Sequence, residues 1–300
     1  MARPGARPGD WKTLPFPASH AEVPVDRVFS IAEMTRLRDG LLPEEMEDKW
    51  FVVWTGEALD LHRSWTGNHI FRVTFAPAPF GEVVARALAN RDPEQYRAPE
   101  AGYDGKMAMW VLDAIVLGRW RKLPVVSPSP PPITLTIGDI TEAGCDAVVN
   151  AANEPLAGGG GVDGAIHDAA GPALIDACRS LPSVGGVRCP TGEARATPAF
   201  ELDARWIIHA VGPIHRGVPD DARLLASAFR AAFDVAVRHG ARTVAVPALS
   251  CGAFRYPLRD AARIAIEVAR EGRDLDEIRF VLFDAKTHAA WKRALDGPGG

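Results

Sequence analysis

The chain has 300 residues, of which 47% are hydrophobic and 24% charged, and its formal net charge is −4. This length predicts about two domains with enough apolar residues for a sizeable core. The acidic balance argues against a dominant electrostatic grip on nucleic acid, although a local basic patch stays open, and no window reaches the roughly 18 continuous apolar residues of a membrane span.

The N-terminus, MARPGARPGD, has no apolar stretch of the kind found in secretory signals, and its composition predicts a frayed tail. The four cysteines form no C-x-x-C pair, so they predict neither a zinc ribbon nor a thioredoxin-like motif. We expect reduced thiols in a cytoplasmic protein.

The N-terminal half predicts a small α+β domain over residues 1–123. The segments KWFVVWTG, ALDLHRSWTG and NHIFRVTF indicate a three-strand meander with turns near Gly56 and Gly67. The segments FGEVVARALANR (80–91) and DGKMAMWVLDAIVLGRW (104–120) both predict helices.

A proline-rich run, PVVSPSPPP (124–132), follows this half. Such a run favours polyproline II and acts as a semi-rigid spacer. Six of the eight tryptophans precede it and all four cysteines follow it. We therefore place the domain boundary there, with a second domain over 133–300.

The second domain alternates strand-like and helix-like segments. Strands are predicted near 133–140, 145–153, 205–213, 242–249 and 278–284, and helices near 163–180, 220–239, 257–272 and 286–295. This alternation predicts a largely parallel sheet covered on both faces. Ligands of such sheets bind beyond the carboxyl ends of the strands, where five residues fall: Asp139, Asn153, Pro213, Ser250 and Asp284.

Two glycine-containing loops lie at this predicted rim. The first is Gly158 to Gly164, within LAGGGGVDGAIHDAAG, and the second is Ser250 to Phe254. Consecutive backbone N–H groups in such loops bind phosphate oxygens without a cation. Two of them suit a diphosphate, although neither matches G-x-G-x-x-G and there is no Walker lysine.

Several polar residues near these loops have two interpretations each. Asp139 suits either an exocyclic amine such as that of adenine or a simple turn. Asn150 and Asn153 both suit turns, and Asn153 could instead flank a ribose and a water together with Asp163. Asp163 is either a helix N-cap or a general base, and His167, one helical turn later, either assists it or is a core histidine.

Taken together, the blocks GDIT (138–141), VVNAANEPLAGGGGVDGAIHDAAGP (148–172), CPTGEA (189–194), HAVGP (209–213) and PALSCGAFRYP (247–257) resemble a macrodomain. More narrowly, they resemble the MacroD-type ADP-ribosyl hydrolases, which include O-acetyl-ADP-ribose deacetylases. The resemblance covers about 133–296 and implies a three-layer α/β/α fold with a mixed sheet.

The resemblance also implies roles for individual residues. Asp139 and Ile140 would hold the adenine edge, and Phe283 would pack on the ring. Asn153 would hold the distal ribose with Asn150 nearby, Phe254 would shape that pocket, and Asp163, with His167, would activate or position water. The residues implied around the diphosphate are Gly159, Gly160, Gly161, Val162, Ser250, Cys251, Gly252 and Ala253.

The implied reaction is hydrolysis of an ester that links ADP-ribose to an Asp or Glu side chain of a protein, or to acetate. The resemblance implies that this reaction needs no cofactor and no metal. The loop GGGGVDGAIH has no cysteine and only the distal His167, so it does not match the zinc-using branch of the family. Residues 153–167 also lack the lysine of the hydrolases that act on DNA bases. The alternative is a macrodomain that binds ADP-ribose without cleaving it.

The resemblance leaves two features of the sequence unexplained. Cys251 stands where serine or threonine is common, and it would be an oxidation-sensitive switch only if its thiol pKa were lowered. HRSWTG (62–67), in the N-terminal domain, resembles no family we recognise. Arg63 and Trp65 there suit contacts to a phosphate and a base, or to a modified protein tail, or a β-turn with a core tryptophan.

Overall fold

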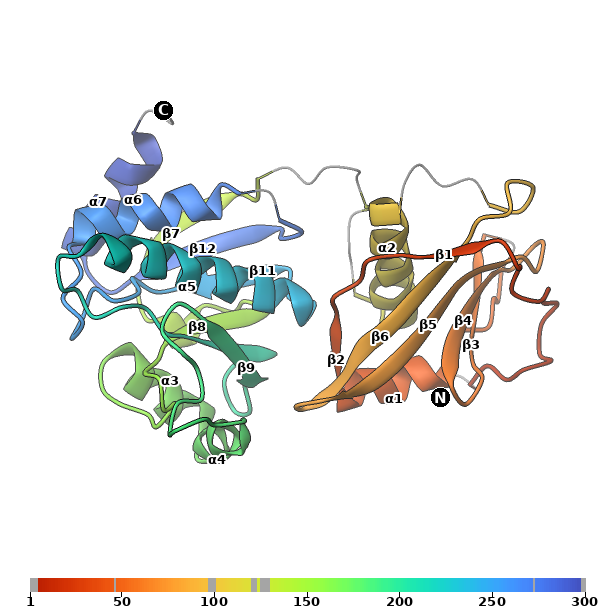
Figure 1. Ribbon diagram of the computed structural model, residues 1–300, viewed down its shortest axis with the longest axis horizontal. Coiled ribbons are helices and arrows are strands. Elements are labelled where there is room, and N and C mark those ends of the chain that lie inside the picture. Colours follow the sequence, from red (N-terminus) through yellow and green to blue (C-terminus); the bar gives the residue numbers. More distant parts are fainter. Residues whose placement is uncertain are drawn as a thin grey trace. The chain divides into compact units, whose positions relative to one another are not determined.

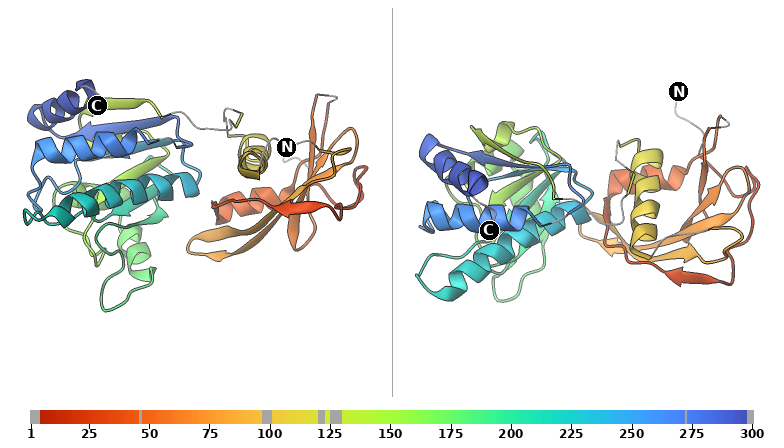
Figure 2. Two further views of the ribbon diagram at one scale, coloured as in Figure 1. Left: turned by 45° about the horizontal axis from the view of Figure 1, so that its top comes forward. Right: turned by 90° about the horizontal axis from the view of Figure 1, so that it is seen from above.

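The computed structural model describes residues 5–45, 47–96, 101–119, 123–124, 130–271 and 273–297. The packing of its Cα atoms divides the chain into two compact units, Met1–Ser127 and Pro128–Gly300 (Figures 1 and 2). The proposed proline-rich spacer falls mainly on residues 125–129, which lie outside the described residues.

The N-terminal unit is an antiparallel sheet with two helices packed on it. The strands lie in the order β1-β6-β5-β4-β3, and β2 also pairs with β6. Its elements are β1 (His20–Glu22), β2 (Val28–Ser30), α1 (Ile31–Asp39), β3 (Trp50–Trp54), β4 (Ala58–Arg63), β5 (His69–Ala78), β6 (Gly81–Asn90) and α2 (Ala101–Trp110), which a π-helical turn (Val111–Val116) continues. Apolar side chains of α1 and α2 share one core with those of β4 and β5.

The meander and the second predicted helix are confirmed, but the helix predicted over 80–91 is wrong. That segment is strand β6, which pairs with β5 on one side and with β1 and β2 on the other. Its alanines favour a helix in isolation. The sharp turn at Phe80, where φ is 62°, folds the segment back on β5, and pairing on both sides outweighs that preference.

The predicted frayed tail is also wrong from residue 5 onward. Ala6 is buried and its N–H donates to the Asp39 carbonyl at 2.6 Å. Ala6 and Trp11 pack against Phe51 and Val53 on strand β3. The first described residues therefore form part of the folded unit.

The C-terminal unit is built on a six-stranded mixed sheet. The strand order is β7-β12-β11-β8-β10-β9, in which β9 is antiparallel to β10 and the other pairs are parallel. Its elements are β7 (Ile133–Ile137), a short 3-10 helix (Ile140–Glu142), β8 (Ala147–Ala151), α3 (Val162–Ala170), α4 (Ala173–Ser180), β9 (Ala194–Pro198), β10 (Trp206–Ala210), α5 (Pro219–Arg238), β11 (Thr243–Val246), α6 (Leu258–Ala269), β12 (Glu277–Leu282) and α7 (Ala285–Asp296).

Helices cover both faces of this sheet, as predicted. Helices α5, α6 and α7 lie side by side on one face, and α3 and α4 lie on the other (Figure 1). This division follows from right-handed crossovers, because the chain moves in opposite directions across the sheet through α3–α4 and through α5–α6. The parallel strands all end at one edge, where the predicted rim residues follow them.

Two details differ from the sequence prediction. The helix predicted over 163–180 is two helices, because Gly171 adopts φ 77° and Pro172 cannot continue the hydrogen bonds of α3. Strand β9 was not predicted, and it makes the sheet mixed. Among the described residues, no helix combines the length and apolar character needed to cross a membrane.

Candidate functional site

The first glycine-rich loop connects β8 to α3 at the carboxyl edge of the sheet. Gly158 and Gly161 have φ values of 79° and 64°, a conformation that side chains oppose. The loop also lies directly on the first turn of α3, because a Cβ at Gly164 would be 2.9 Å from the Gly159 carbonyl oxygen. The glycines therefore give the loop its shape and bring its backbone close to the helix.

Asp163 lies inside the first turn of α3, and only 5% of it is exposed. It is not the helix N-cap, because that position belongs to Gly161. Asn150 Nδ2 donates to Asp163 Oδ1 at 2.5 Å, and His167 Nε2 lies 3.6 Å from the same oxygen. The second oxygen, Oδ2, is buried and has no hydrogen-bond partner among the described residues.

A buried polar network lies behind Asp163. Asn150 is fully buried, and its Nδ2 also lies 3.2 Å from His209 Nδ1. His209 Nε2 lies 2.9 Å from Thr197 Oγ1. Burial, followed by the charge of His167, lowers the pKa of His209 to about 3. A neutral ring that donates from Nε2 to Thr197 and accepts from Asn150 at Nδ1 satisfies both contacts.

The position of Asn150 differs from its predicted place at the ligand surface. It does not line the cavity beside Asp163 but holds the carboxylate from behind. Asn153 does line that cavity. Its Nδ2 donates to the Gly158 carbonyl at 2.9 Å and its Oδ1 accepts from the Ala157 N–H at 3.1 Å. Asn153 therefore shapes the loop and keeps one Nδ2 hydrogen for a ligand.

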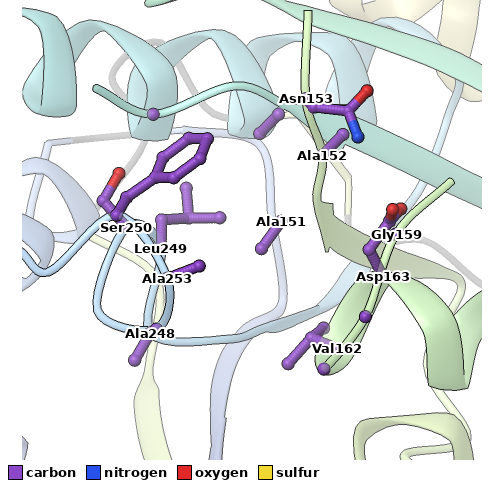
Figure 3. A pocket seen from close by; sticks show the side chains of 16 residues that line it. Ala151, Ala152, Asn153, Gly159, Val162, Asp163, Ala248, Leu249, Ser250 and Ala253 are labelled. Atoms are coloured by element: carbon purple, nitrogen blue, oxygen red, sulfur yellow. The ribbon is translucent and has the colours of Figure 1, made fainter. Parts of the chain in front are cut away.

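A cavity of about 500 Å³ lies between the two predicted loops. Figure 3 shows Asn153 and Asp163 on one side of it and Ser250 and Ala253 on the other. The first loop contributes Gly159, Gly160, Gly161 and Val162, and the second contributes Ser250, Gly252, Ala253 and Phe254. The structure thus brings together the two segments that the sequence placed about 90 residues apart.

The second loop turns sharply at Ser250, where φ is 63°. Gly212, after β10, makes room for it, because a Cβ there would be 2.2 Å from Ser250 Oγ. The neighbouring Cys251 lines a second cavity. Burial raises the pKa of the Cys251 thiol to about 12, so the condition for a reactive thiol is not met.

The second cavity, of about 380 Å³, continues the first, since Gly161, Val162, Ala248 and Gly252 line both. Asp139, Ile140 and Phe283 lie at its far end. Asp139 Oδ1 accepts from the Thr141 N–H at 2.9 Å, so one carboxylate oxygen serves the turn. Phe283 is 86% exposed at this edge, so its ring can be reached by a ligand in this cavity.

A third cavity, of about 520 Å³, lies beyond Asn153 and Phe254, which line both it and the first. Its other lining groups include Glu154, Thr191 and Asp221. His167 lines none of the three cavities, and its Nε2 lies near the Asp163 oxygen that Asn150 holds. The three connected cavities form one elongated cleft along the edge of the sheet.

A family model described as Macro domain matches residues 149–265. A macro domain-containing protein of Streptomyces coelicolor is 53% identical over 165 residues, which are 54% of this chain and 98% of that relative. The chain belongs to the macro domain family. The resemblance noted in the sequence is therefore confirmed at the level of the macro domain.

Solved macro domains share this fold. A macrodomain of Oceanobacillus iheyensis, solved with ADP, is 39% identical with a TM-score of 0.51, over 54% of this chain and 88% of that one. A Trypanosoma brucei macrodomain in complex with ADP is 31% identical with a TM-score of 0.50, over 64% of this chain and 87% of that one.

Sequence reasoning missed part of the macro domain site. His209, Thr197 and Cys178, whose Sγ lies 3.7 Å from His209 Nε2, were not singled out. His209 lies on β10, paired with β8 opposite Asn150, but that pairing cannot be read from the spacing of the two residues. Among the described residues, the group close enough to share a metal ion is Asp60, His62 and His69, which belong to the N-terminal unit.

Proposed function

We propose that the macro domain binds ADP-ribose and hydrolyses its esters, as the MacroD-type enzymes do. The substrates would be mono-ADP-ribose on Asp or Glu side chains of proteins, O-acetyl-ADP-ribose, or both. The observation that carries this proposal is the Asp163 carboxylate. It is buried, held at one oxygen by Asn150, and free of protein hydrogen bonds at the other among the described residues.

The shape of the cleft supports ADP-ribose as the ligand. Asp139, Ile140 and Phe283 would take the adenine, the two loops would surround the diphosphate, and Asn153 and Phe254 would hold the distal ribose. Backbone N–H groups at the start of α3 favour an anion there. The O. iheyensis and T. brucei macrodomains, both solved with ADP, add to this support.

The reaction would proceed by attack of one water molecule. Asp163 Oδ2 would accept a hydrogen bond from that water and would take its proton or orient it. The ester C–O bond breaks, and the products are ADP-ribose and a free carboxylate. Asn150, which the neutral His209 contacts in turn, holds Asp163 in place, so the carboxylate would need little rearrangement before the reaction.

We also propose a cytoplasmic location and an accessory role for the N-terminal unit. All four cysteines are free thiols, as expected in a reducing compartment. Residues 1–123 would form the accessory domain, 124–132 the spacer and 133–300 the catalytic domain, in line with the two compact units.

The test measures ADP-ribose release from a Glu/Asp-mono-ADP-ribosylated protein and from O-acetyl-ADP-ribose. Wild type, Asp163→Asn and the exposed-surface control Asp168→Asn are compared, with ADP-ribose binding measured by calorimetry. We expect Asp163→Asn to bind ADP-ribose but to hydrolyse both esters at least about 100-fold more slowly than the wild type. Binding by the wild type without release from either ester would instead indicate a non-catalytic ADP-ribose reader.

A further inference from the structure

The HRSWTG motif, which the macro domain does not explain, forms a firmly held loop between β4 and β5. Ser64 Oγ donates to the Asp48 carbonyl at 2.5 Å, and Trp11 Nε1 donates to the Ser64 carbonyl at 2.7 Å. The Gly67 N–H donates to the Arg63 carbonyl at 2.8 Å, which closes the turn. The backbone of this loop is therefore held in place by contacts within the unit.

A second set of polar contacts anchors the same loop from the sheet. His62 Nδ1 lies 3.2 Å from the Gly67 carbonyl. Asp60, which His69 Nε2 approaches at 3.3 Å, receives two hydrogen bonds of 2.7 Å from Arg72. Since both Asp60 oxygens are occupied by a guanidinium, this group serves as an anchor for the loop, and a metal ion would have to displace Arg72.

The loop displays two residues in uncommon states. Trp65 is 68% exposed, so the interpretation as a core tryptophan is wrong. The Arg63 guanidinium lies 4.2 Å above the Trp50 ring and is half-buried. Burial lowers the pKa of Arg63, and no described residue accepts a hydrogen bond from its guanidinium or forms an ion pair with it. A half-buried arginine without an acceptor is suited to an anionic ligand.

These residues enclose a small cavity of about 180 Å³. Its lining residues are Lys49, Arg63, Ser64, Trp65 and Thr66. Two of these are cations, and none of them is acidic. The nearby Asp48 carboxylate accepts from the N–H groups of Glu44 and Glu45, at 2.8 and 3.2 Å. The cavity thus lies beside two cationic residues and an exposed aromatic ring.

We propose that this cavity binds a nucleotide unit, with its phosphate between Arg63 and Lys49 and its base against Trp65. The guanidinium and ammonium groups supply charge-assisted hydrogen bonds to phosphate oxygens, and the Trp65 ring supplies a stacking surface for a base. This site belongs to the N-terminal unit and does not depend on the function proposed for the macro domain. Its ligand is either a free nucleotide or a unit of a single-stranded polynucleotide, which share this chemistry.

The test follows the Trp65 ring itself in the full-length chain. The protein is labelled with 5-fluorotryptophan, and the Trp65 resonance is assigned by its loss in Trp65→Phe. AMP, adenosine and inorganic phosphate are then titrated. Because only the Trp65 signal is read, nucleotide bound in the macro domain cleft does not enter the measurement. We expect AMP to shift the Trp65 resonance in a saturable way. Adenosine should bind at least about tenfold more weakly than AMP.

Charge variants decide whether the proposed contacts carry the binding. Arg63→Gln and Lys49→Gln should each weaken AMP binding about tenfold, and the exposed-arginine control Arg36→Gln should leave it unchanged. Lys49 is exposed, so its variant tests the site even if Arg63→Gln disturbs packing on Trp50. The proposal is overturned if the Trp65 signal does not move with millimolar AMP, or if both variants bind AMP with the wild-type affinity.

The source of the nucleotide is separated by one further titration. Binding of oligothymidylate that is tighter than that of AMP and weakens with salt would identify a polynucleotide. Equal or weaker binding would identify a free nucleotide. A Trp65 shift caused by a glutamate-rich peptide and not by AMP would overturn the proposal in favour of a protein ligand.

Discussion

The buried amide of Asn150 holds the carboxylate of Asp163 through a hydrogen bond of 2.5 Å between Nδ2 and Oδ1. This contact fixes the carboxylate from the protein side and leaves Oδ2 facing the first loop, where a Cβ at Gly159 would lie 3.0 Å from it. Asn150 thus positions Asp163 without lining the cleft. A variant of Asn150 should therefore affect catalysis and ligand affinity differently.

Replacing Asn150 with leucine removes the donor while keeping a side chain of similar size. We expect kcat for ADP-ribose ester release to fall about tenfold and ADP-ribose affinity to stay within about twofold, because Asn150 does not line the cleft. The free energy of unfolding should fall by about 1–3 kcal/mol, since a buried carboxylate oxygen loses its partner. Steady-state kinetics, calorimetry and urea unfolding measure the three effects, and an unchanged kcat would exclude a positioning role.

Gly159→Ala tests whether space beside Asp163 Oδ2 is needed. Gly159 is not in the left-handed region, so alanine introduces no backbone strain, but its methyl group would press on Oδ2. We expect ADP-ribose release to slow about tenfold, while the free energy of unfolding falls by no more than about 1–3 kcal/mol. The matched control is Gly102→Ala, because a Cβ there meets nothing within 4 Å. Full activity in Gly159→Ala would show that this side of the carboxylate is not used.

The pKa of His209 predicts acid sensitivity of the macro domain. The pKa of His209 falls from 6.5 to about 3 on folding, so His209 becomes protonated at a higher pH in the unfolded chain than in the folded one. The stabilising contribution is complete above pH 6.5 and is lost as the pH falls from there toward 3, at up to about 1.4 kcal/mol per pH unit. Between about pH 7.5 and about pH 5.5, His209→Asn should lose about 1.4 kcal/mol less stability than wild type.

Urea unfolding at the two pH values measures this difference, with the partly exposed His288→Gln as the control. The control should follow the wild type at both pH values. If His209→Asn and wild type lose equal stability, the neutral buried histidine is not the source of the acid sensitivity.

Cys251 should behave as an ordinary, half-buried thiol. Its pKa is raised to about 12 by burial, so the reactive thiolate is scarce at neutral pH. We expect slow alkylation by iodoacetamide, and we expect Cys251→Ser to retain wild-type release before and after mild peroxide treatment. Mass spectrometry locates the modified cysteine, and rapid loss of activity that Cys251→Ser prevents would restore the switch hypothesis.

The parts of the fold that could be predicted are those whose signal is local. Apart from β9, the strands of the C-terminal unit are apolar or β-branched runs bounded by turns, and the glycines that mark the first loop are adjacent in the chain. The segment 80–91 could not be assigned correctly, because its alanine content favours a helix and only its pairing with β5 and β1 makes it a strand. Strand β9 has the same difficulty, since its partner β10 decides its conformation.

The candidate site shows the same limit. Asp163 and the two loops could be found from short motifs, but the roles of Asn150 and His209 depend on the parallel pairing of β8 with β10. The exposure of Trp65 also could not be predicted, because HRSWTG fits a core turn and a presented loop equally well. Contacts between distant segments decided each of these cases.

The pairing of β7 with β12 has a consequence for how the macro domain is made. β7 is the first strand of the unit and β12 the last, and β12 lies between β7 and β11. During synthesis on the ribosome, β7 cannot pair with β12 until about 140 further residues have emerged. This high contact order predicts slow folding of the domain. An ADP-ribose whose adenine touched Asp139 and Phe283 would then bridge β7 and β12, the first and the last strand of the sheet to be synthesised.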